Sequence, residues 1–384
     1  MKVAMVLEYL DPARGGCETY TAWVASELIR RGHEVTAICH ESPWRCDGLK
    51  VRPLRRRGCC RLRRARHFVA DAALAAAGGD YDVIHAMLPV PGASIYQPHS
   101  GTMPARRAAS LRRRFGIKWG SAWFTGKLNF YRRYLARLER RLVADPRVIC
   151  LCVSDLVAQQ FRRHFGRTEG VRVVFNGARV PQADAPQRDA WRRKRRAELR
   201  VGESATVFLT VATNFVLKGV APAIDAFAEW LGARGDRTDA RLVVVGRDSP
   251  RDYQRRAERR GAGDKVVFLP FSDDIFEWYS AADACVLLSW YDSCSLVTLE
   301  AARWALPSIT TVYNGAAEVL AAGGGIVVSS PLDTSAVAAA MDELTDPAAR
   351  RARSGRCLEA GQHLTIQRHV DELIAVYEEA RQRR

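Results

Sequence analysis

Short apolar segments alternate with amphipathic segments along most of the chain of 384 residues. In the first half, continuous apolar runs of strand length predict strands at 2–9, 34–40, 82–87, 93–99, 148–154 and 171–180. Apolar residues at helical spacing predict helices between Gly16 and Gly32, at 131–145 and at 155–166. Strands that alternate with helices indicate a parallel sheet.

The same alternation resumes in the second half. We expect strands at 206–213, 240–246, 265–270 and 284–290. The predicted helices lie at 221–235, 251–261 and 274–282, with a last one at 369–384. A second parallel sheet follows from this pattern, and its ligands are expected at the carboxyl ends of the strands.

The segment 181–203 interrupts the alternation. It is rich in proline and charge and holds few apolar residues, so we interpret it as a linker. The expected domains are 1–180 and 204–365, followed by a C-terminal helix at 366–384. The fold class is α/β, with two Rossmann-like domains facing across a cleft and the last helix crossing back to the first domain.

The composition is that of a soluble globular protein, with 48% hydrophobic and 26% charged residues. No apolar run reaches the roughly 18 residues that a membrane span needs. The first apolar run meets an acid at Glu8, which favours a strand over a signal peptide. The ten cysteines are therefore expected to be reduced, and their spacing does not predict a zinc site.

The net charge of +17 comes mostly from arginine in the first half. The basic residues cluster at 52–66, 105–120 and 131–141. An anionic membrane surface, nucleic acid, or an arginine-rich composition without any partner could each account for them. Trp119, Trp123, Phe124 and Tyr131 interleave with the second and third clusters, which favours the membrane surface. We expect an anionic membrane partner and no nucleic acid.

Two glycine-containing turns stand between a strand and a helix. Gly15 and Gly16 follow the first strand, where a helix N-terminus can approach an anion, although a bland tight turn fits equally well. The absence of G-x-G-x-x-G counts against a dinucleotide enzyme. In the second half, Asn214–Gly219 form a loop, and Lys218 stands at a helix start, where the helix dipole disfavours a cation. An anionic ligand would relieve this conflict; the alternative is a solvated surface lysine.

Two carboxylates flank another predicted helix start in "WYDSCSLVTLEAARWALPSITT" (290–311). The backbone amides of Cys294, Ser295 and Leu296 would offer an anion site there. Glu300, about one turn further on, can accept hydrogen bonds from sugar hydroxyls, and Asp292 can reach another part of the same ligand. The two acids would then bracket a diphosphate. The alternative is a loop acid and a solvated helix residue. The "DYD" at 80–82 mimics a metal motif, but we interpret it as a turn.

The segment 292–311 resembles the E-x7-E segment of glycosyltransferase family 4, the retaining transferases of the GT-B fold. The segments 246–261 and 161–166 are similar to the lipopolysaccharide core glucosyltransferase I branch of that family. The resemblance covers nearly the whole chain and includes the "NG" at 176–177.

By this resemblance, Lys218, Asp292 and His99 are the catalytic residues: the phosphate-binding lysine, the acid facing the donor sugar, and the cleft histidine near that sugar. Glu300 would hold the nucleotide ribose. The remaining donor-binding residues would be Gly15, Gly16, Arg179, Asn214, Ser295, Leu296 and Val297. The family usually has a glutamate where Asp292 stands and an arginine upstream of the lysine, where this chain has Val216 and Leu217.

The implied reaction is retaining transfer of a hexose from a nucleotide-diphosphate sugar to a lipid-linked saccharide such as lipopolysaccharide core. UDP-glucose is the expected donor, without cofactor or metal. The enzyme would be cytoplasmic and peripheral on the inner face of the cytoplasmic membrane. Alternatives are a nucleotide-sugar epimerase, a sugar phosphorylase or another GT-B enzyme, and a degenerate homologue that has lost catalysis.

Overall fold

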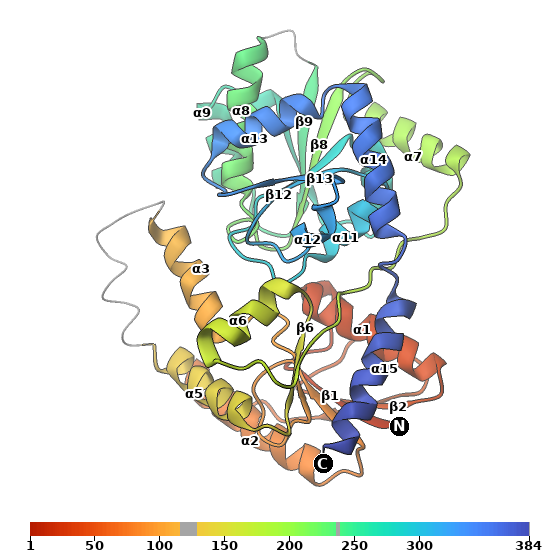
Figure 1. Ribbon diagram of the computed structural model, residues 1–384. Coiled ribbons are helices and arrows are strands. Elements are labelled where there is room, and N and C mark those ends of the chain that lie inside the picture. Colours follow the sequence, from red (N-terminus) through yellow and green to blue (C-terminus); the bar gives the residue numbers. More distant parts are fainter. Residues whose placement is uncertain (116–128, 236–238, 384) are drawn as a thin grey trace. The chain divides into compact units, whose positions relative to one another are not determined.

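The computed structural model describes residues 1–115, 129–235 and 239–383, and the chain forms two compact units (Figure 1). The first unit comprises Met1–Gly177 and Ile366–Arg384, and the second comprises Ala178–Thr365. Each unit is built on its own parallel sheet with helices packed on it. The two parallel-sheet α/β units confirm the expected fold class.

The first unit holds a seven-stranded parallel sheet in the order β3-β2-β1-β4-β5-β6-β7. Its strands are β1 (Lys2–Val6), β2 (Glu34–Cys39), β3 (Leu49–Pro53), β4 (Val83–Ala86), β5 (Ile95–Tyr96), β6 (Ile149–Cys152) and β7 (Val171–Val173). Its helices are α1 (Gly16–Arg30), α2 (Arg61–Ala77), α3 (Met103–Phe115), α5 (Phe130–Ala144), α6 (Asp155–Phe165) and α15 (Ile366–Gln382). The strand order reverses between β1 and β4, which is where ligands of such sheets bind.

The second unit holds a six-stranded parallel sheet in the order β10-β9-β8-β11-β12-β13. Its strands are β8 (Thr206–Ala212), β9 (Ala240–Gly246), β10 (Val266–Pro270), β11 (Ala284–Leu287), β12 (Ser308–Thr311) and β13 (Gly325–Val328). Its helices are α7 (Ala185–Glu198), α8 (Val220–Arg234), α9 (Arg251–Arg259), α10 (Ile275–Ala281), α11 (Leu296–Arg303), α12 (Ala317–Leu320), α13 (Thr334–Glu343) and α14 (Pro347–Gly361). The order reverses between β8 and β11.

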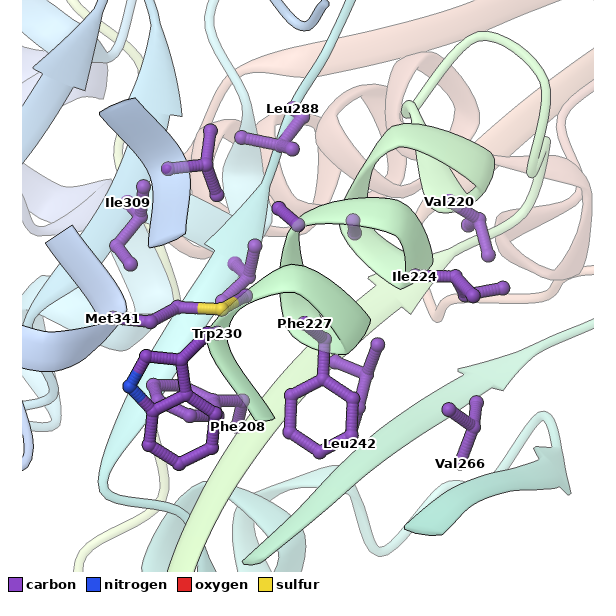
Figure 2. Packing of buried hydrophobic residues seen from close by; sticks show 14 of the residues in the cluster. Phe208, Val220, Ile224, Phe227, Trp230, Leu242, Val266, Leu288, Ile309 and Met341 are labelled. Carbon is purple, nitrogen blue, oxygen red and sulfur yellow. The ribbon is translucent and has the colours of Figure 1, made fainter. Parts of the chain in front are cut away.

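Helix α8 packs against one face of the second sheet. Phe227 and Trp230 lie on this helix and pack against Phe208 of β8, as Figure 2 shows. All three are at most 2% exposed, and burying a side chain of this size stabilises a fold by about 1.5–3 kcal/mol. Val220 and Ile224, nearer the start of α8, belong to the same core, which fixes the helix start that follows the Lys218 loop against the sheet.

The segment 181–203 is not an open linker. Residues Ala185–Glu198 form α7, which Asp184 caps by accepting a hydrogen bond from the backbone N–H of Gln187. Arg196 of this helix is buried, and its guanidinium forms an ion pair with Asp283 at 2.7 Å. The expectation was wrong because a charge-rich segment can still be helical when its charges find partners in the core.

The C-terminal helix α15 belongs to the first unit, as expected, and lies beside α1 in Figure 1. Two buried histidines tie it there: His369 bonds the hydroxyl of Tyr20 at 2.8 Å, and His85 bonds that of Tyr377 at 2.8 Å. Burial lowers the pKa of His85 and of His369 to about 3, so both rings are neutral at pH 7.

The predicted strands and helices are present, most of them with ends that differ by a few residues, although the strand expected at 171–180 ends at Val173. The hydrophobic pattern did not identify β3, α2 or α3 in the first unit, or β13 and α12–α14 near the end of the second unit. The end of β3 and the start of α2 overlap the first basic cluster. Trp119, Trp123 and Phe124 lie outside the described residues. Across the part of the chain that the structure describes, no helix has the length and apolar character needed to cross a membrane.

Candidate functional site

The loop between β8 and α8 is a tight turn seated on the end of β11. The side-chain oxygen of Asn214 accepts a hydrogen bond from the N–H of Leu217 at 2.8 Å, and its backbone carbonyl accepts one from Lys218 at 3.0 Å. Gly219 has φ of +70°, and a Cβ there would stand 2.0 Å from the carbonyl oxygen of Leu288. Glycine is therefore required at this position. Asn214, which we expected to bind the donor, uses its side-chain oxygen to shape the turn.

Lys218 and Asp292 form an ion pair between Nζ and Oδ2. Their side chains are 19% and 12% exposed, so Lys218 is not a solvated surface lysine. The backbone of Asp292 is fixed by hydrogen bonds with the carbonyl of Tyr313 and the N–H of Gly315, each at 2.9 Å. The carboxylate that offsets the lysine at the start of α8 thus comes from the loop after β11. The expected lysine and first acid are together at the carboxyl edge of the sheet.

Helix α11 begins beside this pair. Ser295 caps it by accepting a hydrogen bond from the N–H of Thr298 at 3.4 Å. The N–H of Ser295 donates to the side chain of Asn314 at 3.2 Å, so this amide, which we expected to face a ligand, already has an acceptor. Among the described residues, the N–H groups of Leu296 and Val297 donate to no acceptor. These two amides are available to an anion.

Asn314 organises the site, and the sequence did not single it out. Its side-chain N–H groups donate to the hydroxyls of Thr298 and Thr310 at 3.1 and 3.0 Å. Its backbone pairs with that of Asp292, and its side-chain oxygen holds Ser295. The residue is 1% exposed. One buried amide therefore links the ion pair to the start of α11. Its place just after β12, before Gly315, was the signal available in the sequence.

Glu300 lies on α11, past its first turn, and is partly exposed. The hydroxyl of Tyr279, on α10, donates to Glu300 Oε2 at 3.0 Å. Desolvation raises the pKa of Glu300 to about 7, and the Tyr279 hydrogen bond opposes this rise. The carboxyl thus changes charge near neutral pH. Its partner Tyr279 is a second residue that sequence reasoning missed.

The expected residues of the first unit lie around the carboxyl ends of its strands. Gly15 is the N-cap of α1 and Gly16 its first residue. A Cβ on Gly15 would meet only the carboxylate of Glu18, at 3.5 Å, so crowding does not require glycine there. His99 is buried, with its ring centroid 4.5 Å from that of Tyr20. Arg179 is exposed and belongs to the second unit.

A cavity of about 260 Å³ opens in the first unit beyond the ends of β1, β4 and β5. Aromatic and arginine side chains face it together: Tyr9, Arg14, Arg61, Phe68, Tyr96, Arg106 and Tyr131. Arg14 lies over the ring of Tyr9 at 3.9 Å, and Arg61 over the ring of Tyr131 at 4.3 Å. Such a wall suits a ligand with both an apolar or sugar surface and a negative charge.

The aspartates of "DYD" hold the start of β1. Asp80 forms an ion pair with Lys2 Nζ at 2.6 Å, and Asp82 accepts from the Lys2 N–H at 2.7 Å. Both carboxylates therefore hold the first residue of β1, and the interpretation of "DYD" as a turn stays a prediction. Within residues 1–115, 129–235 and 239–383, no three His, Cys, Asp or Glu side chains gather as metal ligands, and the ten cysteines are free.

Models of two glycosyltransferase families match parts of this chain. The Glycosyltransferase Family 4 model matches residues 14–180, and the model for Glycosyl transferases group 1 matches residues 205–346. The lipopolysaccharide glucosyltransferase WaaG of Escherichia coli K12 is 27% identical over 208 residues, which span 52% of this chain and only 54% of that enzyme.

Solved structures share the fold over almost the full length. A crystal structure of WaaG, a glycosyltransferase involved in lipopolysaccharide biosynthesis, superposes with a TM-score of 0.82 at 22% identity and covers 98% of this chain and 99% of WaaG. Anabaena Alr3699/HepE in complex with UDP-glucose superposes with a TM-score of 0.69 at 17% identity, with 98% and 99% covered.

Proposed function

The chain belongs to the family 4 glycosyltransferases with the GT-B fold, and on that premise we propose that it transfers a hexose from a nucleotide-diphosphate sugar to an acceptor hydroxyl with retention of anomeric configuration. One observation carries the proposal. The Lys218–Asp292 pair stands beside the available amides of α11, and Glu300 lies on that same helix.

The donor diphosphate would lie at the start of α11. Lys218 Nζ and the N–H groups of Leu296 and Val297 would face its oxygens, where negative charge grows as the sugar departs. Fixed donors of this kind favour the transition state over the ground state, because the charge they bind is larger there. Asp292 would then accept from a hydroxyl of the donor sugar, and Glu300 from the ribose. UDP-glucose is our proposed donor, and the UDP-glucose complex of HepE, which shares the fold, supports it.

The acceptor would occupy the cavity of the first unit. The three arginines among its lining residues suit an anionic saccharide, and the likeness to WaaG supports a lipid-linked acceptor such as lipopolysaccharide core. His99 is the proposed residue near the donor sugar, and Gly15, Gly16 and Arg179 are proposed to complete the donor site. We nominate no protein nucleophile, and the proposed reaction uses no cofactor or metal.

A basic surface on the first unit would hold the enzyme at the inner face of the cytoplasmic membrane. Helix α3 carries arginines at 106, 107, 112 and 113. Replacing Arg112 and Arg113 by Ala should weaken binding to vesicles that contain anionic lipid, and more so at low salt. Vesicle binding that is unchanged in this variant would contradict the membrane proposal but leave the transfer reaction intact.

A homologue that binds nucleotide without catalysis is the second candidate. Val216 and Leu217 supply no second cation in the loop, and Asp292 already neutralises Lys218. Such a protein would bind UDP and UDP-glucose but would not turn the donor over.

The test is a transfer assay with purified protein. UDP-, GDP- and ADP-sugars are each supplied with deacylated lipopolysaccharide core, and product mass, released nucleotide diphosphate and the anomeric signal in NMR are followed. We expect a hexose added from a UDP-sugar with retained configuration. Sugar interconversion without an acceptor would indicate an epimerase, dependence on inorganic phosphate a phosphorylase, and binding without turnover the non-catalytic homologue.

A further inference from the structure

The second unit contains a cavity of about 300 Å³. It lies at the amino ends of the strands, opposite to the candidate donor site at their carboxyl ends. Asp283 and Pro307, which line it, immediately precede β11 and β12. Lys218 and Asp292 instead follow the carboxyl ends of β8 and β11. Because the strands are parallel, the two sites lie at opposite ends of the same strands.

The lining of this cavity is strongly basic. Four arginines face it: Arg188, Arg192, Arg350 and Arg351. The two carboxylates in the lining are Asp189 and Asp283. Asp283 is already satisfied, because it accepts from Arg192 at 3.0 Å, from the buried Arg196 at 2.7 Å and from the N–H of Val207 at 2.8 Å. The cavity therefore keeps an excess of positive charge.

Two of the arginines are placed to receive a ligand. The guanidinium of Arg188 lies 3.7 Å above the ring of Trp304, and its buried Nε has no hydrogen-bond acceptor. Arg351 is exposed. In the described part of the chain, neither side chain forms an ion pair. A guanidinium held over an aromatic ring is pre-organised for the paired hydrogen bonds that a phosphate accepts.

The cavity also touches the partner of Glu300. Tyr279, whose hydroxyl donates to Glu300, is part of its lining. Trp304 follows Glu300 by one turn of α11, and its indole N–H donates to Ser280 at 3.1 Å. A molecule in the cavity would therefore contact side chains of α10 and of the residue that follows α11, and these two helices position the acid proposed to hold the ribose.

We propose that this cavity is a second ligand site that binds a small phosphate monoester, such as a sugar phosphate, and that its occupancy changes the affinity for the nucleotide sugar. The volume fits a small metabolite. The arginines would hold the phosphate, and Ala282, Leu306 and Pro307 would contact the rest of the molecule. The binding step stands independently of the proposed transfer reaction; the coupling rests on the role proposed for Glu300.

Calorimetric titration of the full chain tests the binding step, with ribose 5-phosphate and inorganic phosphate as probes and ribose as the neutral control. The site variant is Arg188→Ala with Arg351→Ala. The matched control is Arg259→Ala, an exposed arginine on α9 of the same unit, and Lys218→Ala reports on the opposite edge. Near-ultraviolet circular dichroism verifies the fold of each variant.

We expect wild type, Arg259→Ala and Lys218→Ala to bind ribose 5-phosphate equally, and the double variant to bind it at least about tenfold more weakly, because it loses charge-assisted hydrogen bonds. Equal binding by the double variant, loss of binding in Lys218→Ala, or no binding to wild type would each overturn the proposal.

The coupling is tested by titrating UDP-glucose with and without saturating ribose 5-phosphate. We expect a shift in UDP-glucose affinity in wild type, and no shift in Tyr279→Phe, which keeps the phosphate site. An unshifted affinity in wild type would overturn the coupling. If UDP-glucose does not bind at all, the proposed function fails, while the binding of ribose 5-phosphate still decides the existence of the second site.

Discussion

Asp292 and Glu300 belong to one short segment, yet the surroundings of their carboxylates differ. Asp292 lies against the ammonium of Lys218 and forms an ion pair with it. Glu300 faces the neutral phenol of Tyr279, and desolvation raises its pKa to about 7. Two acids with the same spacing motif can therefore have different roles. Asp292 offsets the charge of Lys218, whereas Glu300 gains or loses its proton near neutral pH.

The largest effect on catalysis should follow from removing Lys218, the cation of the ion pair with Asp292. Lys218→Ala should lower kcat by about 10²–10³-fold, since a fixed donor facing the leaving diphosphate acts mainly in the transition state. Steady-state kinetics with a UDP-sugar would measure it. Lys265→Ala, a lysine of the same unit that lies away from the loop, is the matched control. A fall in both variants would point to a damaged fold.

Asp292→Asn distinguishes two proposed effects of Asp292: neutralising Lys218, which would weaken the binding of UDP, and accepting a hydrogen bond from the donor sugar, which would support transfer. Lys218 would lose its protein carboxylate, so UDP should bind about tenfold more tightly, while transfer should fall because the donor-sugar acceptor group is weakened. Calorimetry with UDP and the transfer assay together measure the split. Weaker binding of UDP would show that Asp292 positions Lys218 and does not compete with the diphosphate.

Glu300→Gln should remove the pH dependence of UDP-glucose binding near pH 7, whereas variants of Asp292 should keep it. The carboxylate accepts ribose hydroxyls better than the acid does, so the affinity of wild type for UDP-glucose should rise by about tenfold as pH increases through about 7. The glutamine variant should bind weakly and without this rise. Titrations of UDP-glucose, whose diphosphate does not change charge in this range, test it. A wild-type affinity that is flat across this range would contradict the raised pKa.

The same pKa predicts how stability changes with pH. The pKa of Glu300 is about 7 in the folded chain, above its ordinary value of 4.5. The folded state therefore holds this proton more tightly, and the contribution of Glu300 to stability is greatest below about 4.5 and is lost as pH rises through about 7. Chemical denaturation should show that wild type loses stability relative to Glu300→Gln over this pH range. Glu139, whose pKa burial also raises to about 7, acts in the same direction in both proteins, whereas the buried His85 and His369, whose pKa values are lowered to about 3, act in the opposite direction.

The smallest effect should come from Tyr279→Phe. The Tyr279 hydroxyl stabilises the charged carboxylate, so its loss should move the midpoint of UDP-glucose binding above pH 7 and weaken binding at pH 7 by about fivefold. At high pH, the affinity of Tyr279→Phe for UDP-glucose should return to that of wild type. A loss that persists at high pH would indicate a direct contact of the hydroxyl with the donor.

The hydrophobic pattern predicted both sheets because buried parallel strands are short apolar runs and the helices between them have apolar residues at helical spacing. The pattern did not predict α7, because this helix packs partly through arginines. One of them is the buried Arg196, which pairs with Asp283. Lys218 and Asp292 were found because each lies in a loop that follows a predicted strand, and Glu300 because it lies about one turn into the helix predicted after Asp292. Tyr279 and Asn314 were missed because their contacts with Glu300 and Ser295 join residues far apart in sequence.

The central claim is that the donor diphosphate binds at the start of α11. A crystal structure with UDP bound tests this most directly. We predict phosphate oxygens within about 3 Å of Lys218 Nζ and of the N–H groups of Leu296 and Val297, with the ribose at Glu300. UDP bound elsewhere, for example among the arginines at the opposite edge of the sheet, would contradict the account.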